Sequence, residues 1–432
     1  MIVIDDATKK IESNSLFEIK EDTAKDATVA AAAQKIIDRI DKEYGAVFAK
    51  SEVVLNGAKA PNGNRDSETN NGDLITDAMV WKILQDKESL TVDADHVVAV
   101  TNGGGIRKAI NPGDVTKKSI NEVLPFGNTV VTIYITGAEL LEALEASTYC
   151  TPDAIGGFPQ VSGINYTIST AVAYDANAET YPASTYYGPK SINRVTINSI
   201  NGKEFKADDT YAVITNDFCG GGGDTYYAFA AATAKFDTGI PLDEVVMEYI
   251  TAELKGVIGK QYAEPQGRIL MNPFKDVKTS AWYGSYVIDL YNDGIINGTS
   301  ATTYAPNDTL TWAAALKLLL VSHGDLKAAD ATGADWSKNT IAKAAELGLV
   351  AADLDGAKAI SRLEFCQVAA KLNKLAESKT ESKFTDCTDG YVMALVDAKV
   401  ISGMTETTFE PAASLTRAQI AKIIYQLNLI EK

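Results

Sequence analysis

Residues 96–107 read His96-Val-Val-Ala-Val-Thr101-Asn102-Gly-Gly-Gly-Ile-Arg107, and they decide how the first part of the chain is interpreted. The stretch from His96 to Thr101 predicts a buried strand in which the histidine is structural or lies at the edge. Three glycines then predict a turn whose backbone N–H groups can approach an anion closely, and Arg107 adds a fixed cation. Loops that follow buried strands commonly carry ligand sites, so this is a candidate binding loop.

Helices and strands interleave on both sides of this loop. Hydrophobic periodicity predicts helices at residues 26–45, 72–85, 137–147 and 243–254, and strands at 46–55, 129–136 and within 191–214. The alternation predicts a mixed α/β domain that spans residues 26–271.

Three further segments carry polar or displayed aromatic groups. They are the polar loop from Arg65 to Gly72, the segment Leu124-Pro-Phe126-Gly-Asn128, and Asn216-Asp-Phe218-Cys-Gly-Gly-Gly-Gly-Asp224. Two aromatic rings can stack a base, a carboxylate can accept hydrogen bonds from ribose hydroxyls, and arginines can hold phosphate. Together the segments indicate a nucleotide site, although each alone is equally compatible with a turn, core packing or a helix cap. The glycine-rich loop fits neither the dinucleotide-binding fingerprint nor a P-loop.

The order and spacing of the four segments resemble the C-terminal domain of the 5'-nucleotidase family. An arginine stands seven residues before a Gly-x-Leu helix start, and NGGGIR, PFGN and a phenylalanine six residues before the Asp of GGD follow in that order. The likeness extends to the ending Tyr262-Ala-Glu-Pro-Gln-Gly-Arg-Ile269. It implies that the domain binds a nucleotide or nucleoside. The implied ligand-binding residues are Arg65 and Arg107 for phosphate, Asn102 and Asn128 for polar contacts, Phe126 and Phe218 for the base, Asp224 for the ribose, and Gly156 for backbone contact.

The sequence departs from the family beside this site. Thr225 and Tyr226 follow GGD where a glycine is usual, and Cys219 adjoins Phe218. Large side chains at these positions are expected to narrow the base pocket or to change its preference.

The last third of the chain is repetitive, with a period of roughly 50 residues that is typical of a helical array. Units begin at Phe274-Lys-Asp276, at the weaker Ala334-Asp-Trp336 and at Phe384-Thr-Asp386, and each continues through a helix, a glycine-containing turn and a second helix. The repeats are expected at residues 274–323, 330–378 and 384–432.

These units resemble S-layer homology repeats. The resemblance implies an all-α spindle of three repeats that binds an anionic secondary cell-wall polymer in its grooves. Arg362 and Arg417 match the polymer-binding arginine of the family, whose planar guanidinium suits a carboxylate or phosphate. The first repeat has Trp312 at that position. The chain is therefore expected outside the cell, in the wall or S-layer of a bacterium.

Hydrolysis in the 5'-nucleotidase family belongs to a separate N-terminal domain that holds two metal ions. Its Asp-x-His, Gly-Asp and Gly-Asn-His motifs do not occur here, and the sequence contains only two histidines, His96 and His323. No catalytic residue, metal ligand or cofactor is therefore expected in this chain, and the divalent metals would belong to the missing domain. Residues 1–25 are expected to be a remnant of that domain or a linker.

Composition limits the other partners. The formal net charge is -17 and no lysine- or arginine-rich run occurs, which argues against nucleic acid. No apolar run reaches the length of a membrane span. The first 22 residues lack the features of a signal peptide, so Met1 is not expected to be the biological start.

Three functional hypotheses follow. The chain is the substrate-binding part of a cell-surface 5'-nucleotidase-like phosphohydrolase in nucleotide catabolism, a wall-anchored nucleotide-binding module without catalysis, or an S-layer component whose α/β domain has drifted. The abrupt start favours the first hypothesis over the second, and the intact set of ligand-binding residues opposes the third.

Overall fold

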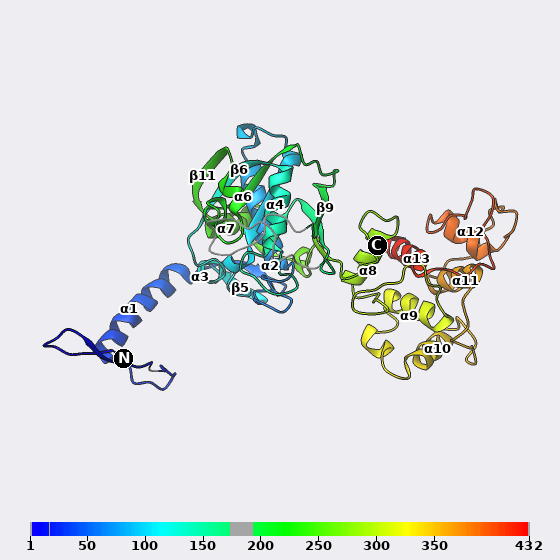
Figure 1. Cartoon of the computed structure of the whole chain (residues 1–432), viewed down its shortest axis with the longest axis horizontal. Helices are drawn as coiled ribbons and strands as arrows, with labels where there is room; N and C mark the ends of the chain where they lie inside the picture. The colour runs from blue at the N-terminus through cyan, green and yellow to red at the C-terminus, as the bar shows by residue number, and fades with distance from the viewer. Residues whose placement is uncertain (1, 17, 173–192, 431–432) are drawn as a thin grey trace.

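The computed structural model describes residues 2–16, 18–172 and 193–430 (Figure 1). The first two positions of the strand region expected at 191–214 lie outside the described residues, and the rest of that region contains two strands. Chain order in the first half alternates strands and helices, as the mixed α/β prediction requires.

A five-stranded sheet forms the centre of the α/β domain. Its strands, in spatial order, are β11 (Ala234–Pro241), β6 (Thr129–Thr136), β10 (Thr210–Asn216), β4 (Val97–Asn102) and β7 (Pro159–Ser162). β10 runs parallel to β4 and antiparallel to β6, whereas β4 and β7 are antiparallel. The ends of β4 and β10 and the beginnings of β6 and β7 therefore meet at one edge of the sheet.

Both faces of this sheet are covered by helices. All six residues of β4 are buried; Val97 and Ala99 belong to one hydrophobic cluster and Val98 and Val100 to another, because successive side chains point to opposite faces. α2 (Asn70–Leu84), α3 (Lys117–Val123) and α7 (Leu242–Ala252) supply the first cluster. α4 (Gly137–Ser147), α5 (Asp217–Gly220) and α6 (Tyr227–Ala230) supply the second.

Smaller elements complete the domain. Two three-stranded sheets are made of β12 (Val257–Ile258), β3 (Val47–Ser51) and β5 (Gly113–Thr116), and of β13 (Ile269–Met271), β8 (Ile164–Ile168) and β9 (Val195–Ile200). Short 3₁₀ helices occur at Lys87–Ser89, Ala94–His96, Gly103–Gly105, Lys260–Tyr262 and, among the repeats, Ala328–Ala331. His96 ends such a helix and precedes β4 instead of opening the strand.

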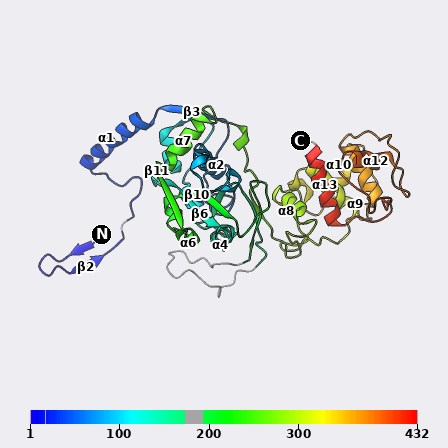
Figure 2. The ribbon, with the colours of Figure 1, turned by 90° about the horizontal axis from the view of Figure 1, so that it is seen from above.

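The N-terminal elements project away from the α/β domain. The predicted bounds of α1 (Ala27–Tyr44) are confirmed, and the Asp26 side chain caps the helix by accepting the N–H of Val29. None of the residues of α1 is buried. The hairpin of β1 (Ile2–Ile4) and β2 (Ile11–Asn14) is exposed throughout. Figures 1 and 2 show both elements on the side of the domain opposite the C-terminal helices.

The C-terminal part contains pairs of helices around a shared apolar core. The helices are α8 (Gly284–Asn292), α9 (Trp312–His323), α10 (Trp336–Glu346), α11 (Arg362–Leu372), α12 (Gly390–Asp397) and α13 (Arg417–Ile430). Isolated bridges join the segments before the second helix of each pair: Thr309 to Thr416, Thr311 to Ala359, and Ser361 to Ser414. Within the described ranges, no helix combines the length and apolar character that crossing a bilayer requires.

A buried charge cluster ties the end of the α/β domain to α2. Arg268 lies 2.8 Å from Asp77 and 3.4 Å from Asp73, and Glu68 accepts the backbone N–H of Ile269. Burial and then the neighbouring Glu68 raise the pKa of Asp73 to about 9, and burial also raises the pKa of Glu68. The Glu68–Asp73 pair therefore retains a proton at neutral pH that the unfolded chain releases.

This retained proton makes stability depend on pH. Because the folded state binds more protons than the unfolded state between the ordinary pKa of Asp73 and about 9, stability falls as pH rises through that range. The slope is at most about 1.4 kcal/mol per pH unit for one proton. We predict that thermal unfolding followed by circular dichroism between pH 7 and 9 shows a falling Tm.

Asp73→Asn should flatten that slope, since it keeps a neutral group at the same place. Asp353→Asn, which removes an exposed carboxylate from the repeats, is the control and should leave the slope unchanged. A steep slope in Asp73→Asn would show that another group holds the proton.

Candidate functional site

The four loops predicted to carry ligand-binding residues converge at one edge of the central sheet. Asn102 ends β4 and Asn216 ends β10, while Asn128 immediately precedes β6. The register places Asn216 opposite Val130 and Asn102 opposite Pro159, the first residue of β7. Strand direction therefore accounts for the convergence of segments that are far apart in the sequence.

Asp224 lies at the centre of this edge. Its carboxylate accepts a 2.7 Å hydrogen bond from Asn102 Nδ2, and its backbone is in the left-handed region, with a φ of 52°. Burial raises the pKa of this carboxyl, whereas the Asn102 hydrogen bond and the nearby positive charge of Arg65 lower it. These interactions show that the predicted residues Arg65, Asn102 and Asp224 form one group.

Asn216 organises the group, and the sequence interpretation missed that role. Its Nδ2 donates to Thr101 Oγ1 at 2.9 Å and to Asn102 Oδ1 at 3.0 Å, while its Oδ1 accepts the N–H of Cys219 and caps α5. A buried asparagine at the end of a strand, immediately before a short helix, was the available signal.

Two phenyl rings are displayed beside the group. Phe126 is 60% exposed and Phe218 is 47% exposed, although both are large apolar residues. They come from the loops at the start of β6 and at the end of β10, which are adjacent strands. The guanidinium of Arg107 lies over the Phe126 ring, 5.6 Å from its centroid, so the cation and this ring share one surface.

Hydrogen bonds fix the remaining predicted residues. Asn128 Nδ2 donates to Asp217 Oδ1 at 2.6 Å, which links the two aromatic-bearing loops. The Gly156 carbonyl accepts the N–H of Gly104 at 2.7 Å. The carbonyl of Arg65 accepts the N–H of Ile155, so the Arg65 loop and the Gly156 loop are joined as well.

Gln160 on β7 supports the Arg65 loop, a role that the sequence interpretation also missed. This side chain is fully buried. Its Oε1 accepts the N–H of Thr69, and its Nε2 donates to the carbonyls of Asn64 and Ser67. The loop is therefore positioned by a satisfied amide, which stabilises a conformation that the loop sequence alone does not specify.

The three departures from the family pattern lie beneath the aromatic loop. Cys219, Thr225 and Tyr226 are each fully buried. Tyr226 donates a 2.8 Å hydrogen bond to the Gly157 carbonyl and stacks on Phe229. These side chains pack into the core, and the expectation that they narrow the base pocket or change its preference stays a prediction.

Arg362 and Arg417 open the second helices of their units at matching positions. Arg362 donates to the Ser402 carbonyl and lies 4.7 Å from the centre of the Phe409 ring. Arg417 donates to the Asn297 and Tyr304 carbonyls and lies 4.4 Å from the centre of the Tyr304 ring. Both arginines therefore join their own unit to a neighbouring one.

The histidines lie far from this group in the fold. His96 stands at the opposite end of β4, between Asp95 and Asp209, and His323 ends α9 in the repeats. Across the part of the chain that the structure describes, no group of three or more His, Cys, Asp or Glu side chains is arranged to hold a metal ion.

Comparison with known families assigns both parts of the chain. The 5'-nucleotidase C-terminal domain profile matches residues 47–231, and the S-layer homology domain profile matches residues 273–315 and 386–421. The chain contains a 5'-nucleotidase C-terminal domain followed by S-layer homology domains. The latter indicate an extracellular bacterial protein attached to the cell wall.

Several known proteins are similar to parts of the chain. The chain is 33% identical over 257 residues to the trifunctional nucleotide phosphoesterase protein YfkN of Bacillus subtilis, covering 59% of this chain and 16% of the relative. It is 32% identical over 173 residues to the cell wall protein Lmo0130 of Listeria monocytogenes, covering 39% and 19%. A solved 5'-nucleotidase precursor from Thermus thermophilus is 31% identical with a TM-score of 0.44, covering 56% and 42%. The chain thus spans less than half the length of each.

The glycine run of this 5'-nucleotidase C-terminal domain is required at its first position. A Cβ on Gly103 would overlap the backbone carbonyl of Asn64, whereas one on Gly105 would lie 3.2 Å from Asn102 Oδ1, a contact that a small shift of a few tenths of an ångström relieves. We predict that Gly103→Ala costs about 3 kcal/mol and lowers the Tm of the domain by about 6–12 °C. Differential scanning calorimetry, with Gly105→Ala as the matched control, measures this. Equal effects of the two substitutions would contradict the close approach of these loops.

Proposed function

We propose that the α/β domain binds a nucleotide or nucleoside at the edge where its four loops converge. The observation that carries this proposal is the grouping of Asp224, Asn102 and Arg65 beside two exposed phenyl rings. Cationic, carboxylate and aromatic groups together match the three parts of a nucleotide, and no one of these groups alone would do so.

Each part of the ligand has a candidate partner. Phe126 and Phe218 stack the base, because exposed rings on adjacent loops offer apolar faces that every base can use. Asp224 accepts hydrogen bonds from the ribose hydroxyls, since its carboxylate is held in place by Asn102.

Phosphate is the third part of the ligand. Arg65 and Arg107 bind it, and the buried Nε of Arg65, which has no hydrogen-bond partner within the described structure, gains one. Asn128 and the Gly156 backbone make further contacts to the nucleotide.

The chain thus serves as the substrate-binding part of a cell-surface phosphohydrolase of nucleotide catabolism. In this proposal hydrolysis is done by a separate metal-bearing domain, and the two histidines of this chain, His96 and His323, lie far apart in the described structure. The domain division that we propose is a linker or remnant at 1–25, the nucleotide domain at 26–271, and S-layer homology repeats at 274–323, 330–378 and 384–432.

Nucleotide capture without hydrolysis is directly measurable. We predict that the purified chain binds adenosine and AMP in isothermal titration calorimetry and releases no phosphate with Mn²⁺, Co²⁺ or Zn²⁺. Phe218→Ala should weaken binding about tenfold, because stacking on one base contributes about 1–3 kcal/mol.

Phe236→Ala is the matched control, since Phe236 is also an exposed phenylalanine but lies within strand β11, away from the four loops. Unchanged binding in Phe218→Ala would remove the stacking role. Metal-dependent phosphate release by the intact chain would contradict the separation of binding from catalysis.

We also propose that the repeats form a three-pronged spindle that binds the anionic wall polymer. The three isolated bridges join the repeats in a ring, and each second helix begins at an equivalent position with Trp312, Arg362 or Arg417. Carbonyl and ring contacts fix both arginines, so little side-chain entropy remains to be lost when an anion binds. Trp312 carries no charge, so the groove of the first repeat is expected to bind the polymer differently.

Wall binding can be tested by cosedimentation with purified cell walls, before and after chemical removal of the anionic polymer. Arg417→Ala should weaken sedimentation about tenfold, because a hydrogen bond to a charged group contributes about 1.5–3 kcal/mol. Lys379→Ala removes an equal charge from an exposed position and should have no effect. Equal binding by Arg417→Ala, or full binding to stripped walls, would argue against this role.

A further inference from the structure

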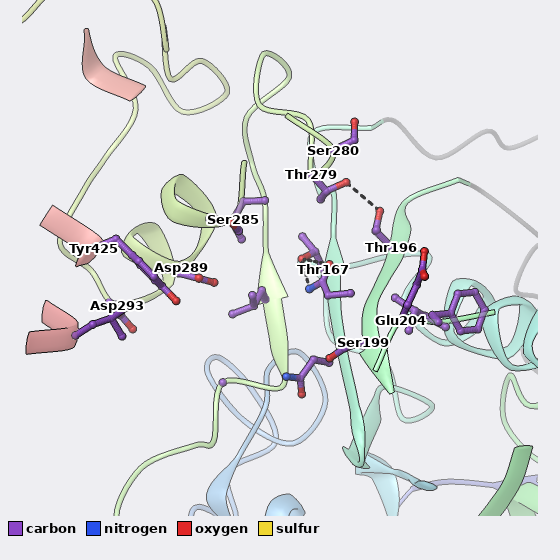
Figure 3. Close-up of a pocket in the computed structure, with 18 of the residues that line it drawn as sticks. Thr167, Thr196, Ser199, Glu204, Thr279, Ser280, Ser285, Asp289, Asp293 and Tyr425 are labelled. Carbon is purple, nitrogen blue, oxygen red and sulfur yellow. Dashed lines mark hydrogen bonds between the residues drawn. The ribbon is translucent and has the colours of Figure 1, made fainter. Parts of the chain in front are cut away.

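A cavity of about 1100 Å³ lies between the α/β domain and the repeats (Figure 3). One wall is the sheet of β13, β8 and β9, and the other is formed by α8, α13 and the segment that precedes α8. Its lining shares no residue with the four nucleotide-binding loops or with the positions of Arg362 and Arg417. The cavity is therefore a separate feature that the proposed function does not use.

The two walls are held together by direct contacts. Met271 and Asn292 exchange two hydrogen bonds of 2.9 Å, and Asn272 Nδ2 donates to the Val277 carbonyl at 2.8 Å. Thr196 and Thr279 meet across the cavity, with their hydroxyls 3.4 Å apart. The cavity is thus framed by residues of both domains.

Neutral polar side chains dominate the lining. Hydroxyls come from Thr167, Thr196 and Ser199 on one wall and from Thr279, Ser280 and Ser285 on the other. Among the described residues that line the cavity, none is lysine or arginine. Such a surface suits a ligand rich in hydroxyl groups and disfavours an anion.

Two of the three carboxylates that line the cavity lie together at one end, and the third lies on the opposite wall. Asp289 and Asp293 stand one turn apart at the C-terminal end of α8, where the helix dipole is negative, and Glu204 lies on the opposite wall. Burial and then the charge of Asp293 raise the pKa of Asp289 to about 6. Asp289 and Asp293 therefore interact electrostatically at this end of the cavity.

An aromatic ring adjoins these carboxylates. Tyr425 of α13 lies beside these carboxylates, and Figure 3 shows its ring extending beside Asp289 and Asp293. The nearby Leu270 and Ile288 add apolar surface. A ring face beside hydrogen-bonding groups matches the mixed apolar and polar faces of a sugar ring.

We propose that this cavity binds an amino sugar that carries a free amino group, as a unit of a wall glycan. Its ammonium group lies between Asp289 and Asp293, its hydroxyls bond to the Ser and Thr side chains of both walls, and its ring packs on Tyr425. The carboxylates of the cavity are opposite in charge to Arg362 and Arg417 of the repeats. The chain therefore recognises two chemically different wall components. Because both domains line the cavity, occupancy also holds them in a fixed relative position.

The test uses a glucosamine tetramer and its fully N-acetylated counterpart, which share one backbone but differ in charge. We expect isothermal titration calorimetry on the full chain near neutral pH to detect the glucosamine tetramer, with about tenfold weaker binding of the acetylated form. Asp289→Asn, which preserves shape and removes the charge, should weaken binding of the glucosamine tetramer about tenfold. Tyr425→Phe should retain the stacking and most of the binding.

Asp353→Asn controls for non-specific attraction of a cation by an acidic protein, since it removes one exposed carboxylate far from the cavity. Circular dichroism establishes that each variant is folded. Equal affinity for both tetramers, equal effects of Asp289→Asn and Asp353→Asn, or no binding of the glucosamine tetramer would each overturn the proposal. Nucleotide binding at the four loops is measured separately, and its failure would not affect this result.

Discussion

The parallel pairing of β4 with β10 is the constraint on which the rest of the α/β domain depends. Because the two strands run in the same direction, Asn102 and Asn216 end at the same edge and can exchange a hydrogen bond. Asn102 then holds Asp224, and Asn216 caps the helix that carries Phe218. Two short amides thereby position the carboxylate and one aromatic ring together.

The same edge gathers cations on a chain that is acidic overall. The formal net charge is -17, yet local geometry sets the sign of the field at a site. Arg65 lies near Asp224, and Arg107 stands over Phe126, so cations and rings are interleaved. At the interdomain cavity the local charge has the opposite sign, because Asp289 and Asp293 share one helix end.

Buried polar groups support both the site and the domain boundary. Gln160 satisfies the backbone of the Arg65 loop, and Arg268 joins β13 to the carboxylates of α2. Removing one partner from such a network leaves a desolvated group without compensation, which costs more than the intact interaction contributes. These networks therefore specify loop positions more strongly than apolar packing does.

Sequence alone determined several of the helices and strands and the chemical groups carried by the loops. Periodicity located α1 and α2 to within about two residues, because Asp26 and Thr69 cap them through local hydrogen bonds. Motif spacing identified the four loops, and the exposure of Phe126 followed from its Pro and Gly neighbours. These features depend on residues close together in the chain.

Only the tertiary structure decided which groups meet. The Asn216–Asn102–Asp224 connection joins residues more than a hundred positions apart, and nothing local to Asn216 distinguishes it from an ordinary helix cap. Tyr226 and Cys219 lie in the core, which their neighbours in the sequence did not indicate. The cavity between β8, β9 and α8 exists only because two domains pack together, so no single segment of sequence records it.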